Sequence, residues 1–129
     1  MLNIDKNSRR PIYEQIIESV ERRIAAGVLR ENQKLPSIRE LAVALSINPN
    51  TIQKAFVELD RAGLIVSYAG RGCYVAADAR EKLRAKRLSE LSEIERLAGE
   101  LKTAGIELES VLEAVRRAYQ KEEEGRADD

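Results

Sequence analysis

The chain has 129 residues, of which 43% are hydrophobic and 34% charged, and its formal net charge is zero. This length allows one packed domain with an appendage. No apolar run approaches the roughly 18 residues of a membrane span, and the N-terminus lacks the apolar segment of a secretory signal, so neither is predicted. One cysteine without a partner predicts a reducing, cytoplasmic compartment, and the absence of histidine excludes histidine-based metal sites and histidine-dependent acid–base catalysis.

The first predicted helix runs from Pro11 to about Ala26. Proline suits a first helical position because its missing N–H would have no partner there. Apolar residues recur at spacings of four, three and four along this segment, which predicts one buried face, and Gly27 supplies a stop. That face consists of Tyr13, Ile17, Val20 and Ile24, widened by Ile12 and Ile16.

Two short helices follow, separated only by a link at Ser46-Ile47. Ser37 and Glu40 have the spacing of a capping box, in which each side chain accepts a hydrogen bond from the backbone N–H of the other residue. Asn48 as N-cap and Pro49 as first helical residue begin the next helix. Both helices carry apolar stripes, so the pair has the layout of a helix-turn-helix. The stripes are Ile38, Leu41, Ala42 and Leu45, and then Ile52, Ala55, Phe56 and Leu59.

Two strand-like runs come next, Leu64–Tyr68 and Cys73–Val75, both rich in β-branched and aromatic residues. Gly70 and Gly72 between them permit the positive φ angles of a tight hairpin and leave Arg71 at its tip. A hairpin directly after a helix-turn-helix is the wing of a winged helix-turn-helix. The order of elements therefore favours a DNA-binding regulator.

From Asp78 onward the composition is that of long charged helices. One helix is predicted from Asp78 to Lys102 or Thr103, Gly105 interrupts the pattern, and a second amphipathic helix follows. Two helices alone bury too little apolar surface to be stable, so we expect them to pair with a second subunit. The predicted dimer interface consists of Leu88, Leu91, Ile94, Leu97, Ala98, Leu101, Leu108, Val111, Leu112, Val115 and Tyr119.

The predicted fold is therefore mainly α with a small β-hairpin wing, an α+β arrangement. Residues 1–77 form a winged helix-turn-helix domain, residues 78–121 a helical dimerisation segment and residues 122–129 a disordered tail. Residues 1–77 hold eleven Lys and Arg against eight Asp and Glu, a net of +3, and residues 78–129 hold eleven against fourteen, a net of −3. A modestly basic first half suits a protein whose cations meet DNA locally.

Four motifs in this order resemble the DNA-binding domain of the GntR family of bacterial regulators over about residues 9–76. They are RPIYEQI at Arg10–Ile16, LPSIRELA at Leu35–Ala42, NPNTI at Asn48–Ile52 and GRG at Gly70–Gly72. The short two-helix tail is similar to that of the YtrA subfamily, and it is too short for the effector-binding or pyridoxal-phosphate-binding domains of other branches. The resemblance implies a homodimeric transcription factor on a double-stranded DNA operator, a repressor often linked to transporter genes, with no enzyme activity and no cofactor.

The start of the third helix is the predicted base-reading surface, because recognition helices touch base edges there. Asn and Gln pair with adenine and Thr approaches a thymine methyl group, while Pro49 shapes the helix start. The resemblance adds Arg39 as a phosphate or base contact, and Arg71 is expected in a minor groove or at a phosphate. Ser37 is first a helix cap and also a candidate phosphate contact. The predicted DNA-binding residues are Ser37, Arg39, Asn48, Pro49, Asn50, Thr51, Gln53, Lys54, Gly70, Arg71 and Gly72.

Each assignment has a structural alternative, namely a solvated helix face with Asn48 only capping and an exposed turn arginine at Arg71. Arg9 and Arg10 are either phosphate contacts or a solvated arm, and Cys73 is either strand filler or a redox-sensing thiol. A protein-interaction module without specific DNA binding is the alternative function, and the basic wing tip argues against it. The sequence contains no recognisable nucleophile–base pair, phosphate-cradling glycine loop or metal-binding motif, and it does not identify an effector.

Overall fold

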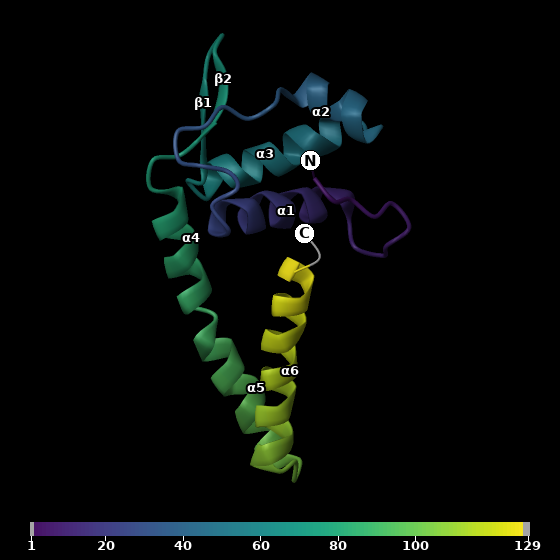
Figure 1. Ribbon diagram of the computed structural model, residues 1–129, viewed down its shortest axis with the longest axis vertical. Helices are drawn as coiled ribbons and strands as arrows, with labels where there is room; N and C mark the ends of the chain where they lie inside the picture. The colour runs from purple at the N-terminus through teal and green to yellow at the C-terminus, as the bar shows by residue number, and fades with distance from the viewer. Residues whose placement is uncertain (1, 128–129) are drawn as a thin grey trace. The chain divides into compact units, whose positions relative to one another are not determined.

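The computed structural model describes the backbone of residues 2–127 and the side chains of residues 2–121. The chain forms two compact units, the first ending at Arg87 and the second beginning at Leu88. A mainly α chain with one antiparallel hairpin confirms the predicted fold class. Along the part of the chain that the structure describes, no helix has the length and apolar character needed to cross a bilayer. In chain order, the elements are α1 (Ile12–Ala25), α2 (Ile38–Leu45), α3 (Pro49–Arg61), β1 (Ile65–Tyr68), β2 (Gly72–Val75), α4 (Ala79–Leu88), α5 (Leu91–Thr103) and α6 (Leu108–Ala127) (Figure 1).

The first unit is built around α3, against which α1 and α2 pack. Their apolar stripes meet because helical spacing puts each stripe on one side of its helix. The core contains Ile16, Val20 and Ile24 from α1, Leu41 from α2, and Ile52, Ala55, Phe56 and Leu59 from α3. Other stripe residues, including Tyr13 and Ile17, are partly buried and pack against this core. Pro11 is the N-cap of α1 and Ile12 its first helical residue, so the prediction of Pro11 as the first helical residue is wrong by one position.

The two helices of the helix-turn-helix begin at the predicted caps. The Oγ of Ser37 accepts a hydrogen bond from the backbone N–H of Glu40 at 3.0 Å, and the Oδ1 of Asn48 accepts one from the N–H of Asn50 at 2.9 Å. Pro49 is the first residue of α3, as predicted. The capping box is only half formed, because the hydrogen bonds of the described residues do not include one from the Ser37 N–H to the Glu40 carboxylate.

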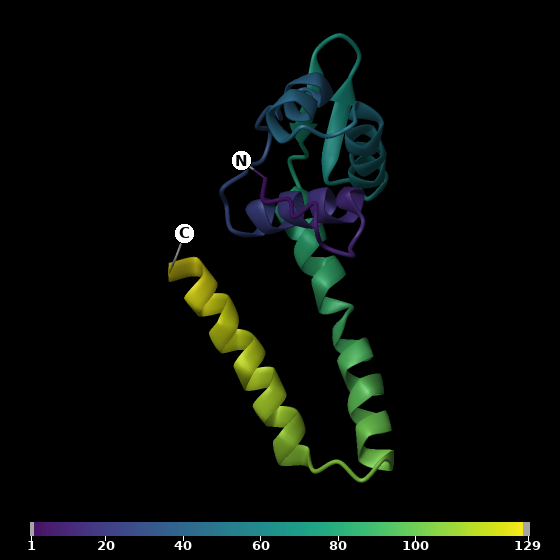
Figure 2. The same cartoon turned by 90° about the vertical axis from the view of Figure 1, so that its right-hand side faces the viewer.

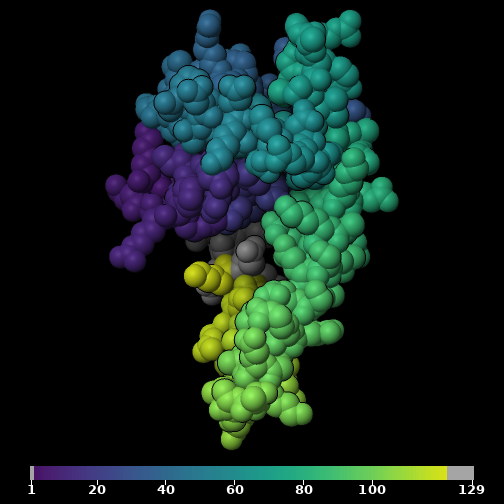
Figure 3. Space-filling model, turned by 180° about the vertical axis from the view of Figure 1, so that it is seen from behind, coloured from purple at the N-terminus to yellow at the C-terminus, as the bar shows by residue number. Residues whose placement is uncertain are grey.

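The wing is wider than the predicted hairpin. β1 and β2 pair antiparallel, with Ile65 opposite Val75, and residues 32–35 run along the other edge of β2. The Asn32 N–H donates to the Val75 carbonyl at 2.9 Å, and the Val75 N–H donates to the Gln33 carbonyl at 2.8 Å. A segment from before α2 thus behaves like a third strand, which the sequence did not predict. In the space-filling view the hairpin projects from the body of the first unit (Figure 3).

The single long helix predicted from Asp78 to residue 102 or 103 is wrong. The chain forms α4 and α5 instead, and they are separated at Ser89-Glu90. The Oγ of Ser92 donates a hydrogen bond to the Ser89 carbonyl at 2.9 Å. Such local bonds from serine side chains compete with the regular helical pattern, which explains an interruption at this point.

α4 belongs to the first unit and not to a separate C-terminal segment. Ala79 and Leu83 are buried in the core of that unit. The carboxylate of Glu21 in α1, a residue only 3% exposed, meets the ammonium of Lys86 at 3.2 Å and the guanidinium of Arg87 at 3.4 Å. The compact unit consequently extends to Arg87, beyond the boundary that the sequence predicts at residue 77.

The second unit is a helical hairpin whose two helices, α5 and α6, diverge from a turn at residues 104–107 (Figure 2). The apolar side chains predicted for the dimer interface lie on these helices and at Leu88, and each is exposed or partly exposed. α6 extends to Ala127, and the disordered tail at residues 122–129 stays a prediction. Residues 128–129 lie outside the described residues.

Candidate nucleic-acid interface

The start of α3 presents the polar side chains that the sequence singles out. Asn50 and Gln53 are exposed, and Thr51 is partly buried. Asn48 caps the helix with its side-chain carbonyl, which leaves its amide N–H groups as donors. Among the described residues, no hydrogen bond engages the side chains of Asn50 or Gln53. Both are therefore available for the paired hydrogen bonds that amides make with base edges.

Lys54 lies further along α3 and turns toward α1. Its ammonium is 3.8 Å from the centre of the Tyr13 ring, a cation–π contact. Lys54 is exposed, but its ammonium already has a partner in the unbound protein, whereas the side chains of Asn50 and Gln53 form no hydrogen bond with the described residues. Sequence reasoning did not find this contact, because it joins two residues of different helices.

The first turn of α2 and the start of α3 carry three further predicted residues. Ser37, Arg39 and Pro49 are all exposed. Ser37 is held by its capping bond, and its hydroxyl hydrogen stays available as a donor. Arg39 forms no ion pair with any residue that the structure describes. Its position off the apolar stripe of α2 leaves the guanidinium in solvent, where a phosphate or a base could reach it.

The wing tip is a tight, braced turn. Gly70 and Gly72 have φ angles of 75° and 100°, values that side chains with a Cβ rarely adopt. The Arg71 N–H donates to the Tyr68 carbonyl at 3.0 Å, and the rings of Tyr68 and Tyr74 meet edge to face with centroids 5.6 Å apart. Arg71 is exposed at the tip, as predicted, and no described carboxylate pairs with it.

Cys73 sits in the strand behind this tip. It is a partly buried free thiol, and its Sγ lies 3.2 Å from the Oγ of Ser67, the residue opposite it on β1. Such a cross-strand pair contributes to hairpin stability. The geometry fits the interpretation of Cys73 as a strand filler.

Arg10, one of two arginines before α1, is tied into the protein. Its Nη1 donates to the Oε2 of Glu18 at 2.6 Å, and its guanidinium lies 4.0 Å from the carboxylate of Glu14. The hydrogen bond from Arg10 lowers the pKa of Glu18 below its ordinary value, and the same bond raises the pKa of Arg10. Arg10 thus has a structural role in the unbound protein, while its neighbour Arg9 is exposed.

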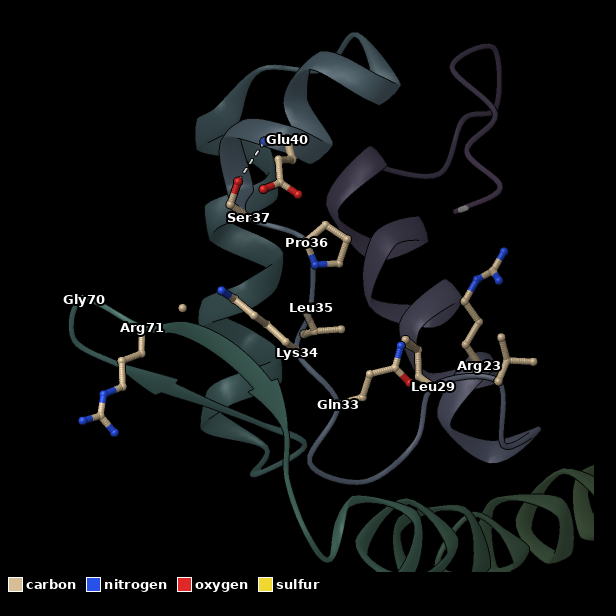
Figure 4. A pocket seen from close by; sticks show the side chains of 12 residues that line it. Arg23, Leu29, Gln33, Lys34, Leu35, Pro36, Ser37, Glu40, Gly70 and Arg71 are labelled. Atoms are coloured by element: carbon tan, nitrogen blue, oxygen red, sulfur yellow. Dashed lines mark hydrogen bonds between the residues drawn. The ribbon is translucent and has the colours of Figure 1, made fainter.

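A groove of ≈ 630 Å³ lies between the start of α2, the segment before it and the wing (Figure 4). Its lining includes Ser37 and the wing residues Gly70–Gly72, and also Arg23 and Lys34, which sequence reasoning did not select. The only sequence signal for Lys34 is its place directly before the Leu35–Ala42 motif. Within the described chain, acidic residues and the cysteine form no cluster of three or more suited to a metal ion.

A helix-turn-helix is followed by a glycine-tipped wing, and α2, α3 and the wing all carry exposed polar or basic side chains. This combination defines a winged-helix DNA-binding protein. The chain belongs to the GntR family, since the family described as "Bacterial regulatory proteins, gntR family" matches residues 12–75.

Similarity to known regulators extends beyond this domain. The HTH-type transcriptional repressor YtrA of Bacillus subtilis (strain 168) is 38% identical over 117 residues, covering 90% of each chain. A GntR family transcriptional regulator from Listeria monocytogenes has 33% identity and a TM-score of 0.69, covering 86% of this chain and 97% of that chain. The DNA-binding domain of AraR, in complex with operator ORR3, has 31% identity and a TM-score of 0.51, covering 57% of this chain and 89% of that chain. The chain is a YtrA-like transcriptional regulator, and its family consists of regulators and not enzymes.

Proposed function

We propose that this protein is a homodimeric repressor that binds an inverted-repeat operator through α3 and the wing. The observation that carries the proposal is the group of exposed polar side chains at the start of α3, of which Asn50 and Gln53 make no side-chain hydrogen bond to the described chain. Side chains at this end of a recognition helix read base edges in the major groove.

The base-reading roles follow from the chemistry of each side chain. Asn50 and Gln53 are suited to paired hydrogen bonds with adenine, and Thr51 to contact with a thymine methyl group. Asn48 and Pro49 set the direction of the helix start, and Asn48 keeps its amide donors for a nearby phosphate or base.

The remaining candidates are suited to the DNA backbone. Arg39 and Ser37 on α2 would meet phosphates, which fix the position of the protein on the duplex without reading sequence. Arg71 would enter a minor groove or meet a phosphate, with the flanking glycines shaping the tip. Lys54 would join them only if DNA draws it away from the Tyr13 ring.

The exposed apolar side chains of α5 and α6 support a homodimer. Leu91, Ile94 and Leu101 follow an alternating spacing along α5 and are 40 to 54% exposed within the chain. A second copy would cover them, and its two-fold symmetry would match an inverted repeat with half-sites about one helical turn, ~34 Å, apart or somewhat further.

Similarity to the YtrA repressor along 90% of both chains supports repression as the sign of regulation. Transporter genes as targets follow from the resemblance to the YtrA subfamily. Because bacterial chromosomal DNA is the proposed partner, the proposed site of action is the cytoplasm. An effector, if one acts on this regulator, has no assigned site.

The deciding experiment compares a duplex carrying the gene's own promoter with a scrambled duplex of equal length, from about 50 to about 300 mM salt. Preference for the promoter that survives at high salt supports a sequence-specific regulator. Equal binding that disappears with salt would contradict the proposal and favour a protein-interaction module.

Substitutions separate base reading from backbone contact. Asn50→Ala or Thr51→Ala should reduce the preference for promoter over scrambled DNA, because a good base contact is worth about 1–3 kcal/mol of discrimination. Arg71→Ala should weaken binding to both duplexes equally and lower the salt slope by about 1. Fluorescence anisotropy titrations across the salt series measure both quantities. The same effect from all three variants would contradict the assignment.

A further inference from the structure

The segment before α2 is held in place by the wing. Residues 32–35 are hydrogen-bonded to the outer edge of β2, and Lys34 forms a β-bridge with Tyr74. The Leu35 N–H also donates to the Cys73 carbonyl at 2.8 Å. The backbone that carries Lys34 is therefore fixed on both sides of the residue, so its side chain leaves the protein at a defined place.

The side chain of Lys34 lies across the groove between α2 and the wing. It is exposed, no described carboxylate pairs with it, and it reaches between Ser37 and Gly70 (Figure 4). Its stem passes close to Gly72, where an added Cβ would lie 3.2 Å from the Lys34 Cε. A glycine at position 72 therefore serves both the wing turn and the path of this lysine.

The other charged groups around this groove leave its centre to Lys34. Arg23 and Arg71 lie to either side and extend away from it (Figure 4). Glu40 also lines the groove, and it is the one carboxylate among the described residues of that lining. Ser37 contributes a hydroxyl that can still donate a hydrogen bond. One ammonium and one hydroxyl at an open surface fit a single phosphodiester group better than a base edge, because lysine acts on phosphate as a point charge.

We infer that Lys34 contacts a backbone phosphate of duplex DNA in this groove, between the DNA phosphates met by α2 and those met by the wing. The inference rests on the proposed DNA-binding function and adds a residue to it. The contact holds α2 and the wing together on the duplex, because Lys34 stands on the segment that leads into α2 and is hydrogen-bonded to β2. It carries no sequence information itself, since phosphates are common to all sequences.

The test uses the full-length protein and compares Lys34→Gln with Lys34→Arg and with Arg80→Gln, a matched loss of charge at an exposed residue of α4. Lys34→Gln should weaken binding to promoter and scrambled duplexes by the same factor, about three- to tenfold near 100 mM salt, and lower the salt slope by about 1. Lys34→Arg and Arg80→Gln should both keep the salt slope of the wild type. Circular dichroism melts establish that each variant is folded.

Three results would overturn the inference while leaving the proposed function intact. The first is a slope for Lys34→Gln equal to that of Arg80→Gln. The second is a loss of promoter preference in Lys34→Gln, which would make the residue a base reader. The third is Lys34-dependent binding of inorganic phosphate together with equal DNA affinity of the wild type and Lys34→Gln, which would make the groove a site for a small anion and not for duplex DNA. Failure of the wild-type protein to prefer its promoter would instead count against the proposed function.

Discussion

Single polar side chains decide where the elements of the DNA-binding unit begin, and the sequence predicts them well when their partners are close in the chain. Ser37 and Asn48 cap helices through bonds to residues two or three positions away, so spacing alone reveals them. Lys54 and Arg10 behave differently. Their partners, Tyr13 and Glu18, lie on α1, and only packing brings the groups together.

The Ser37 cap of α2 contributes to the free energy of unfolding. Ser37→Ala should lower the free energy of unfolding by about 1 kcal/mol, because the N–H of Glu40 loses its acceptor. Ser37→Asp supplies another acceptor and should retain most of the stability. Urea denaturation of the three proteins measures the difference. A Ser37→Ala protein as stable as the wild type would show that water replaces the cap at no cost.

The ion pair before α1 predicts a dependence of stability on pH. Because Arg10 lowers the pKa of Glu18 in the folded protein, the pair stabilises the fold above the ordinary glutamate pKa, about pH 4. This stabilisation is lost as the pH falls through the lower pKa of the folded state. The difference in unfolding free energy between wild type and Arg10→Gln should therefore be constant above about pH 5 and shrink in acid. Urea denaturation at a series of pH values checks this, and a difference independent of pH would contradict it.

At the scale of elements, periodicity predicts helices α1 to α3 and the hairpin because each has one side facing the core. It fails at α4, where the sequence reads as the start of a single long charged helix. The small residue Ala79 and the isolated Leu83 do not form a conspicuous stripe, yet both are buried. The edge pairing of residues 32–35 with β2 also escapes sequence reasoning, because a strand-like neighbour from a distant loop leaves no periodic signal.

The joint between α1 and α4 depends on the buried carboxylate of Glu21. Glu21→Ala should lower the free energy of unfolding by about 2 kcal/mol, since charged hydrogen bonds to Lys86 and Arg87 are lost. The exposed Glu31→Ala variant is a matched control and should change it by less than about 0.5 kcal/mol. In a double-mutant cycle, Glu21→Ala and Arg87→Ala should couple by at least about 0.5 kcal/mol. Additive effects would show that the ion pair contributes nothing beyond packing.

At the scale of the whole molecule, the first unit has a packed apolar core, whereas the described apolar side chains of the second unit are exposed or partly exposed. In the second unit, Leu108 and Tyr119 are 72% and 74% exposed, and no described residue of α5 is buried. Apolar side chains left in water cost free energy that a second copy can recover by covering them. The sequence predicts the exposed apolar face from composition and spacing alone. The register of a proposed pairing with a second copy would depend on contacts that one chain does not contain.

A charge placed on the apolar face of α5 should therefore separate the copies without unfolding the DNA-binding unit. Ile94→Glu should convert a dimer into a monomer in sedimentation velocity runs. It should also weaken operator binding by more than tenfold, because two linked half-site contacts become independent. Gly99→Glu introduces the same residue on another side of α5, where an added Cβ meets no other atom within 4 Å, and should leave both properties unchanged. The melting temperature of the wild type should rise with protein concentration, and that of Ile94→Glu should not. A wild-type protein that sediments as a monomer at every concentration would contradict the homodimer, and the inverted-repeat operator would then lose its structural basis.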